Sequence, residues 1–171
     1  MKERFGLITL KGQPITLTGN TVQEGDAAPD FQVVDNDFKP FSFSSLKDKV
    51  AIITSVPSLD TPVCDLEARR FNQEAVKLGD DVQILVISMD LPFAQKRWCA
   101  AAGVNNVLTL SDHKDASFGT QYGMLIKELR LLARAVFVVD RQKSIRYMEL
   151  VKEVGQEPNY ELALDAAKKL L

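Results

Sequence analysis

The sequence predicts an α/β fold in which helices flank both faces of a mixed β-sheet and a β-hairpin precedes the sheet. Short runs rich in β-branched residues, typical of buried strands, alternate with segments whose apolar residues recur every three or four positions, as on one helix face. With 171 residues, of which 46% are hydrophobic, the chain is long enough for a substantial core. We therefore expect residues 1–171 to form a single domain.

The first predicted elements are strands. Apolar and polar residues alternate on both sides of Lys11-Gly12-Gln13-Pro14, which predicts an N-terminal hairpin. After a turn-rich loop at 24–31, FQVVD (31–35) is a short candidate strand. DKVAIITSVP (48–57) is a β-branched run of the kind that is buried in a parallel sheet.

A helix is predicted from Pro62 to the residue before Gly79. Thr61 can serve as its N-cap, and proline suits the first helical position because its missing N–H would have no partner there. One face of this helix is apolar, at positions 64, 68, 71, 75 and 78. Cys64 therefore lies in the first turn, on the side that faces the protein.

The rest of the chain continues the alternation and ends with a hairpin and a helix. Strands are predicted at 81–90, 105–112, 131–140 and 144–151, helices at 91–103 and 158–171, and a short helix or loop at 113–123. This order of elements is typical of a thioredoxin-like fold with an added N-terminal hairpin.

Composition and charge exclude several classes of function. The net charge is −2, with no basic cluster for nucleic acid and no polybasic run for an anionic membrane. No apolar run approaches the roughly 20 residues of a membrane span, and the first residues lack the apolar core of a secretory signal. We therefore expect a cytoplasmic protein whose two cysteines are reduced or redox-cycling.

Cys64 is the candidate nucleophile. Unpaired backbone N–H groups and the positive end of the helix dipole favour an anion, and the thiolate is the reactive form of cysteine. The Thr61 hydroxyl could donate to the sulfur or to an approaching oxygen, while Pro57 and Pro62 would stiffen the turn and shield it. The alternative is a buried cysteine that packs as a small hydrophobe, and the local sequence leaves both interpretations open.

Arg134 is the second candidate, in the middle of an otherwise apolar run that predicts a central strand, 131–140. A buried guanidinium without an anionic partner is costly, so Arg134 should have one. The partner could be a carboxylate. It could also be a thiolate at the C-terminal edge of a neighbouring strand, where open α/β sheets carry their sites.

These residues resemble a known family. Pro57, Thr61 and Cys64 match the Pro-x-x-x-Thr-x-x-Cys motif of peroxiredoxins. Five segments are similar, in the same order, to those of bacterial thiol peroxidases, which are atypical two-cysteine peroxiredoxins: PSLDTPVC, RRFNQEA, DLPFAQ, WC and ARAVFVVD. The resemblance extends to the hairpin and to the final EPNYELAL, so it covers nearly the whole chain. One departure is IKELRLL (126–132), which lacks the Gly/Pro character of many members.

The resemblance implies an antioxidant enzyme that reduces hydrogen peroxide and organic hydroperoxides and needs no metal or organic cofactor. Cys64 would be the peroxidatic cysteine and would become a sulfenic acid, with Thr61 holding the peroxide oxygens, Arg134 stabilising the thiolate and Pro57 shielding the site. Cys99 would be the resolving cysteine, and thioredoxin would reduce the resulting Cys64–Cys99 disulfide. The family also implies a homodimer.

Other interpretations remain for this thiol chemistry. Without the resemblance, Cys99 would more simply be a helical core cysteine, and the same disulfide could serve a non-catalytic redox-sensing module. A cysteine hydrolase would need a histidine partner, but His113, the only histidine, lies in a polar stretch that predicts a surface position. Two cysteines and one widely spaced histidine are also a poor zinc site.

The two cysteines are predicted on separate helices. A disulfide needs Cα atoms roughly 4.4–6.8 Å apart, whereas packed helix axes lie ~8–10 Å apart. We therefore expect a reduced form with both helices intact, and local unwinding when Cys64 and Cys99 become linked.

Overall fold

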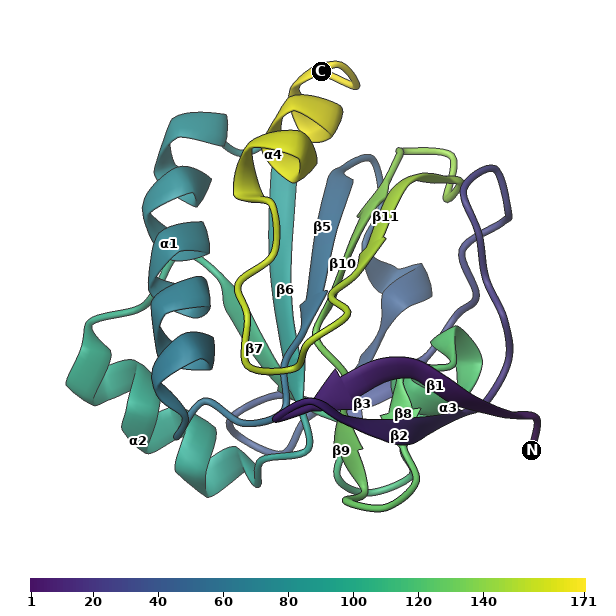
Figure 1. Cartoon of the computed structure of the whole chain (residues 1–171). Coiled ribbons are helices and arrows are strands. Elements are labelled where there is room, and N and C mark those ends of the chain that lie inside the picture. The colour runs from purple at the N-terminus through teal and green to yellow at the C-terminus, as the bar shows by residue number, and fades with distance from the viewer.

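The computed structural model of the protein describes residues 1–171, and it confirms the mixed sheet, the flanking helices and the N-terminal hairpin (Figure 1). The larger sheet has seven strands: β3 (Gln32–Val34), β4 (Pro40–Ser42), β5 (Val50–Ser55), β6 (Val82–Ser88), β7 (Leu108–Ser111), β10 (Ala135–Val139) and β11 (Ile145–Leu150). Their order is β11-β10-β5-β6-β7-β3-β4. The pairs β5–β6 and β6–β7 are parallel, as the predicted alternation of strands and helices requires, and the other pairs are antiparallel.

The hairpin belongs to a second, smaller sheet. Its strands are β1 (Glu3–Leu10), β2 (Gln13–Thr18), β8 (Leu125–Ile126) and β9 (Leu131–Leu132), in the order β1-β2-β8-β9. Leu10 pairs with Gln13, so Lys11 and Gly12 form a two-residue turn. Their φ angles are 50° and 78°. Positive φ at both central residues defines a type I′ turn, whose twist matches that of the flanking strands.

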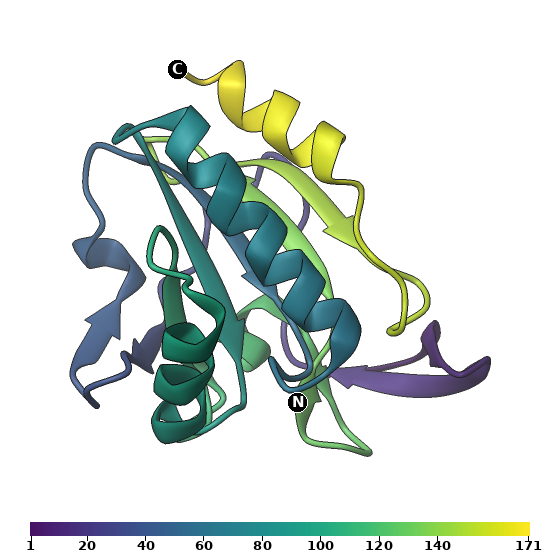
Figure 2. The same cartoon turned by 90° about the vertical axis from the view of Figure 1, so that its left-hand side faces the viewer.

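Helices cover both faces of the seven-stranded sheet. The helices are α1 (Pro62–Leu78), α2 (Pro92–Ala102), α3 (Ser117–Tyr122) and α4 (Tyr160–Lys168), with a 3₁₀ turn at Phe43–Ser45. Helices α1 and α4 lie side by side over one face (Figure 2), where they pack on β5, β6 and β10. Helix α3 and the hairpin pack on the other face. None of the helices is both long and apolar enough to span a membrane.

The bounds of α1 are those predicted, but its cap and its buried face differ in detail. Thr61 occupies the N-cap position, yet its hydroxyl donates to the Ser58 carbonyl (2.9 Å) and does not cap the helix. The buried face includes two acidic residues, Glu67 and Glu74, while Ala75 is half-buried. Apolar periodicity therefore located the face correctly and missed the charges on it.

The run 131–140 is not one strand, and this prediction was wrong. Strand β9 ends at Leu132 and pairs in the small sheet, whereas β10 begins at Ala135 and pairs with β5 in the large one. Arg134 lies in the link between the two sheets. The Ala133 backbone N–H there donates to the Met124 carbonyl (2.8 Å), and the Ala133 carbonyl accepts from the Ser55 hydroxyl (2.7 Å). The backbone groups of this link are therefore hydrogen-bonded by partners outside the strand ladder. The link can be buried like a strand, which is why the run 131–140 resembles one continuous strand.

Asp112 is a buried carboxylate from which we derive a pH dependence of stability. It accepts from the backbone N–H groups of Phe118 (3.0 Å) and Gly119 (2.8 Å), and burial nevertheless raises its pKa from 3.8 to about 6. The folded protein thus holds this proton more tightly than the unfolded chain does. The stability that protonated Asp112 contributes is complete below about pH 3.8 and is lost as the pH rises through about 6.

We expect the unfolding free energy of wild type, relative to Asp112→Asn, to fall by at most about 3 kcal/mol across that range. Urea unfolding of both proteins at about pH 4 and about pH 7 measures this difference, and the other carboxylates cancel in the comparison. A difference that is the same at both pH values would contradict the assignment.

Candidate active site

Cys64 is the third residue of α1 and is fully buried, with 0% of its surface exposed. The loop that precedes it is anchored by Asp90, two residues after the end of β6. The Asp90 carboxylate accepts from the Ser58 hydroxyl (2.6 Å), the Leu59 backbone N–H (2.8 Å) and the Ser88 hydroxyl (2.7 Å). Asp90 was not among the predicted site residues. The available signal was its place at the carboxyl end of a buried parallel strand, where α/β folds build their sites.

Arg134 contacts the sulfur of Cys64 and two further acceptors. Its Nη2 lies 3.2 Å from Cys64 Sγ, its Nη1 donates to Glu67 Oε2 (2.6 Å), and its Nε donates to the Val154 carbonyl (3.1 Å). Only 2% of Arg134 is exposed. The two partners considered for this guanidinium, a carboxylate and a cysteine sulfur, are therefore both present.

Glu67 is the carboxylate that sequence reasoning missed. It is fully buried one turn after Cys64, and it also accepts from the Thr54 hydroxyl. Burial raises the pKa of Glu67, against Arg134 and Thr54, which lower it. Burial lowers the pKa of Arg134, but the Glu67 carboxylate and the Cys64 sulfur together raise it above its usual value. The spacing from position 64 to 67 already placed both side chains on one helix face.

Thr61 and Pro57 lie in the loop before α1. Pro57 is buried, whereas Thr61 is exposed. The Thr61 hydroxyl donates to the Ser58 carbonyl, whereas we expected it to donate to the sulfur or to an approaching oxygen. Because its proton is used in this way, its oxygen is left to accept a hydrogen bond.

Cys99 lies on α2 and is half-buried. Its sulfur is 3.2 Å from the Thr109 hydroxyl and 3.8 Å from Asn36 Nδ2, so it faces β7 and the turn between β3 and β4. Both cysteines are free and both helices are complete, as expected for the reduced form. The structure does not bring Cys99 into the Cys64 cluster.

Helices α1 and α2 are nevertheless linked next to the two cysteines. Trp98 Nε1, one residue before Cys99, donates to the carboxylate of Asp65, one residue after Cys64 (2.8 Å). Asp65 also accepts from Arg69 Nε (2.9 Å), whose Nη1 reaches the carbonyl of Ala102 (3.2 Å). We call Asp65, Arg69 and Trp98 the interhelical link.

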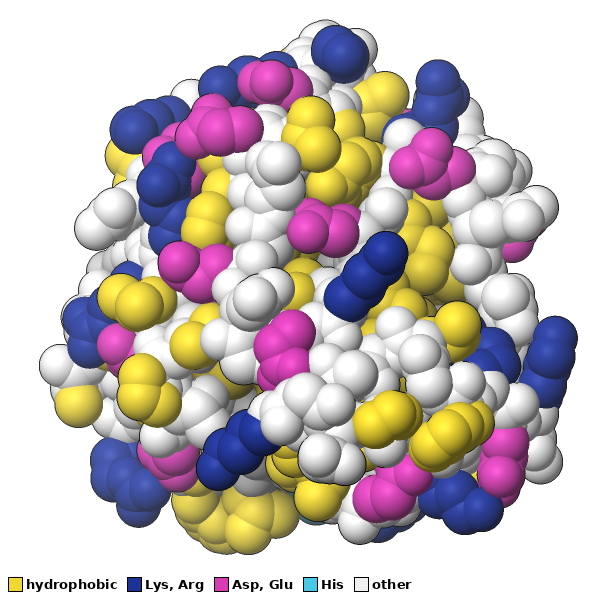
Figure 3. All heavy atoms as spheres, in the orientation of Figure 1, with side chains coloured by type: hydrophobic (Ala, Val, Ile, Leu, Met, Phe, Trp, Pro, Cys, Tyr) yellow, Lys and Arg dark blue, Asp and Glu magenta, His cyan; other side chains and the backbone are white.

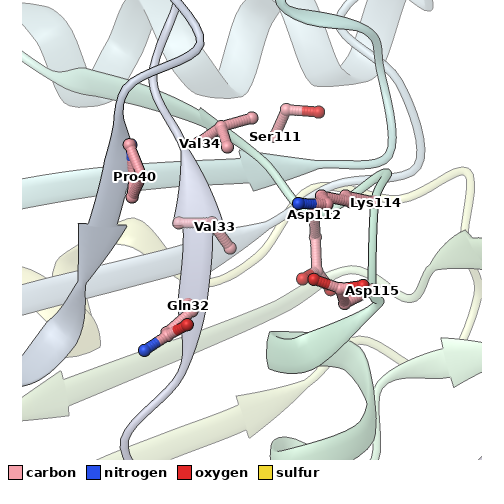
Figure 4. Close-up of a pocket in the computed structure, with 8 residues that line it drawn as sticks. All are labelled: Gln32, Val33, Val34, Pro40, Ser111, Asp112, Lys114 and Asp115. Atoms are coloured by element: carbon pink, nitrogen blue, oxygen red, sulfur yellow. The ribbon is translucent and has the colours of Figure 1, made fainter.

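His113 and the pocket near it lie outside the Cys64 cluster. The His113 ring is half-buried, not on the open surface, because its Nδ1 contacts the Ser111 hydroxyl (2.8 Å) and the ring faces Phe38 edge-on. A pocket between β3 and the segment after β7 (Figure 4) contains none of the predicted site residues.

Comparisons with known proteins agree with the resemblance noted in the sequence. The Redoxin family model matches residues 23–164. A protein named thiol peroxidase from Halalkalibacterium halodurans is 54% identical over 164 residues, which cover 96% of this chain and 98% of that protein. A thiol peroxidase from Bacillus subtilis (strain 168) is 55% identical with the same coverage. A peroxiredoxin-like protein from Aquifex aeolicus has a TM-score of 0.91 and 40% identity, covering 98% of this chain and 99% of that one.

Proposed function

This chain belongs to the redoxin family and, within it, to the thiol peroxidases, and on that premise we propose that it reduces hydroperoxides with Cys64 as peroxidatic and Cys99 as resolving cysteine. The observation that carries the proposal is the contact of 3.2 Å between Arg134 Nη2 and Cys64 Sγ, in a site where both residues are buried. A guanidinium held there by a buried carboxylate places positive charge beside the sulfur, which reacts as a thiolate.

In the first step the Cys64 thiolate attacks the terminal oxygen of the hydroperoxide. A sulfur–oxygen bond forms and the oxygen–oxygen bond breaks, so the sulfur becomes a sulfenic acid. The leaving group is an alkoxide, or hydroxide when the substrate is hydrogen peroxide, and a proton from the buffered solvent converts it to an alcohol or to water. Arginine has five N–H donors, and three protein contacts use one each. Nη1 and Nη2 of Arg134 therefore each keep an N–H for the peroxide oxygens, whose charge grows as their bond breaks.

Thr61 and Pro57 complete the proposed peroxide site. The Thr61 hydroxyl oxygen would accept the hydrogen bond of the peroxide O–H, because its own proton is bound to Ser58. Pro57, which is buried, would exclude water from the sulfur. Cys64 itself has no exposed surface. Peroxide would therefore enter when the exposed end of the loop before α1, which contains Thr61, moves.

In the second step the thiol of Cys99 condenses with the Cys64 sulfenic acid to give a disulfide and water. The Cys99 sulfur faces Thr109 and Asn36, so α2 has to open before the bond can form. Thioredoxin would then restore both thiols by thiol–disulfide exchange.

The interhelical link gives a prediction for this second step. Trp98→Phe keeps an aromatic ring and removes the N–H that donates to the Asp65 carboxylate. Because that bond is broken when α2 opens, we expect disulfide formation to become about tenfold faster, as for one hydrogen bond to a charged group. The rate of Cys64 oxidation should stay unchanged, since the N–H of Trp98 donates to Asp65 and not to the sulfur. Rapid quenching followed by thiol alkylation measures both steps, and disulfide formation at the wild-type rate would contradict the prediction.

A coupled assay tests the proposed function against the redox-sensing alternative. Wild type is mixed with thioredoxin, thioredoxin reductase, NADPH and either hydrogen peroxide or an organic hydroperoxide. An enzyme consumes peroxide over many turnovers, with matching oxidation of NADPH. Consumption that stops after about one equivalent per chain would favour a redox switch.

We extend the proposal to the expected homodimer, the single domain and a cytoplasmic location. Figure 3 shows hydrophobic side chains gathered at the lower edge of the molecule, below α2. Near the start of α2, Phe93 is 71% and Leu91 53% exposed, and the Phe93 ring lies 4.8 Å from that of Phe38. A second copy would cover this apolar surface, which sedimentation of the Phe93→Glu variant would test.

Both apolar clusters pack on the seven-stranded sheet, which supports one domain. Free thiols are typical of cytoplasmic proteins, which supports a cytoplasmic location.

A further inference from the structure

The N-terminal hairpin is hydrogen-bonded to the loop between β11 and α4, and this loop is in turn hydrogen-bonded to Arg134. The hairpin lies outside residues 23–164, the part of the chain matched by the Redoxin family model. In Figures 1 and 2 the loop between β11 and α4 nevertheless runs beside the end of β1. The Thr9 backbone N–H donates to the Lys152 carbonyl (2.7 Å), and the Thr9 carbonyl accepts from the Val154 N–H (2.9 Å). The loop thus extends the hairpin as a short parallel bridge.

Glu153, between these two bonded residues, fastens the loop to the hairpin turn. Its carboxylate accepts from the Thr9 hydroxyl (2.5 Å) and from the backbone N–H groups of Lys11 (3.0 Å), Gly12 (3.2 Å) and Gly155 (3.3 Å). The type I′ turn presents two successive N–H groups, an arrangement that binds anions. The Thr9 hydroxyl, followed by these N–H groups, lowers the pKa of Glu153 to about 2, so the carboxylate is ionised at neutral pH.

The next residue, Val154, connects this fastening to the active site. Its carbonyl accepts from Arg134 Nε (3.1 Å), while the Val151 N–H donates to the Arg134 carbonyl (3.0 Å). The loop therefore holds both the backbone and the side chain of Arg134. Because a guanidinium is planar and rigid, fixing Nε on Val154 and Nη1 on Glu67 determines where Nη2 meets the sulfur of Cys64.

We propose that Glu153 is a positioning residue for peroxide reduction: by fastening the loop to the hairpin turn, it fixes the Val154 carbonyl and, through it, the orientation of Arg134 against Cys64. The hairpin is then part of the scaffold of the active site. This inference rests on the proposed function, in which Arg134 serves the reaction of Cys64.

The first test is the rate of Cys64 oxidation by hydrogen peroxide in a single turnover of the full-length protein. We expect Glu153→Ala to slow this step about tenfold, as for the loss of hydrogen bonds to a charged group. Thr9→Val removes one donor and keeps the carboxylate, so it should give a smaller loss and remains informative if Glu153→Ala folds poorly. The later rate of disulfide formation should not change in either variant.

Glu128 provides a matched control, because its carboxylate is hydrogen-bonded to the same hairpin at another position. Glu128 lies in the turn between β8 and β9. Its carboxylate accepts from the Thr16 N–H with both oxygens (3.0 Å each) and forms no hydrogen bond with the loop between β11 and α4. Glu128→Ala should therefore oxidise at the wild-type rate. A loss equal to that of Glu153→Ala would mean that any loosening of the hairpin slows the reaction, and would overturn the specific role of Glu153.

A double variant separates positioning from general stability. Lysine has a single nitrogen in place of the three that contact Val154, Glu67 and Cys64, so Arg134→Lys already removes the rigid link between Val154 and the sulfur. Adding Glu153→Ala to Arg134→Lys should then have little further effect, whereas independent roles would multiply the two losses. Multiplied losses, or a Glu153→Ala variant as fast as an active wild type, would refute the inference. A wild type that does not reduce peroxide would instead refute the proposed function.

Discussion

Cys64→Ser is expected to abolish peroxide reduction, because a serine hydroxyl cannot replace a thiolate as the nucleophile toward peroxide oxygen. Cys99→Ser is expected to retain the first step, since the contacts of the Cys64 sulfur with Arg134 do not involve α2. That variant should reduce about one equivalent of hydroperoxide and then stall as a sulfenic acid, which excess peroxide oxidises further. Measuring peroxide consumed per chain, without thioredoxin, distinguishes the two variants.

The control for this experiment is wild type under the same conditions, which should also consume about one equivalent and end as a disulfide. Unfolding by urea should show that both serine variants are folded. Equal loss of the first turnover in Cys64→Ser and Cys99→Ser would contradict the division of labour between the two cysteines.

Arg134→Met is expected to lower both stability and reactivity. The substitution leaves Glu67 buried without its cationic partner, and breaking a buried ion pair in this way costs about 3–5 kcal/mol of unfolding free energy. It also removes the donors that would stabilise the charge on the reacting oxygens, so the first-turnover rate should fall roughly 10²–10³-fold. Urea unfolding followed by Trp98 fluorescence and single-turnover oxidation by hydrogen peroxide measure the two effects.

A double variant keeps this prediction interpretable. Adding Glu67→Gln to Arg134→Met removes the unpaired buried charge, so much of the lost stability should return. The first-turnover rate should stay low, because no guanidinium contacts the sulfur. A double variant that recovered stability and rate together would mean that Arg134 serves folding alone.

Local sequence determined most element boundaries because local chemistry sets them. Proline at the first position of α1 and a glycine with φ of 76° after its last residue fixed both ends of that helix. The β1–β2 turn was predicted at residues 11–14, and the structure narrows it to Lys11 and Gly12. The apolar face of α1 placed Cys64 inside the protein for the same reason.

The missed features depend on contacts between distant parts of the chain. At the break between β9 and β10, the backbone of Ala133 is hydrogen-bonded to Met124 and Ser55, and no local pattern encodes those partners. The burial of Glu67 was not predicted because the residue is charged. A buried carboxylate is expected only once a buried guanidinium is known to face it. The bond of Val154 to Arg134 likewise depends on how β11 returns beside β10.

Site-resolved mass spectrometry after one equivalent of hydroperoxide tests most directly the claim that Cys64 takes the oxygen and passes the oxidation to Cys99. Wild type should yield a linked pair of peptides that contain Cys64 and Cys99, with the loss of two hydrogens. Cys99→Ser should yield one added oxygen on the Cys64 peptide, trapped as a sulfenic acid. Oxygen on Cys99 with an unchanged Cys64, or no linked pair in wild type, would contradict the account.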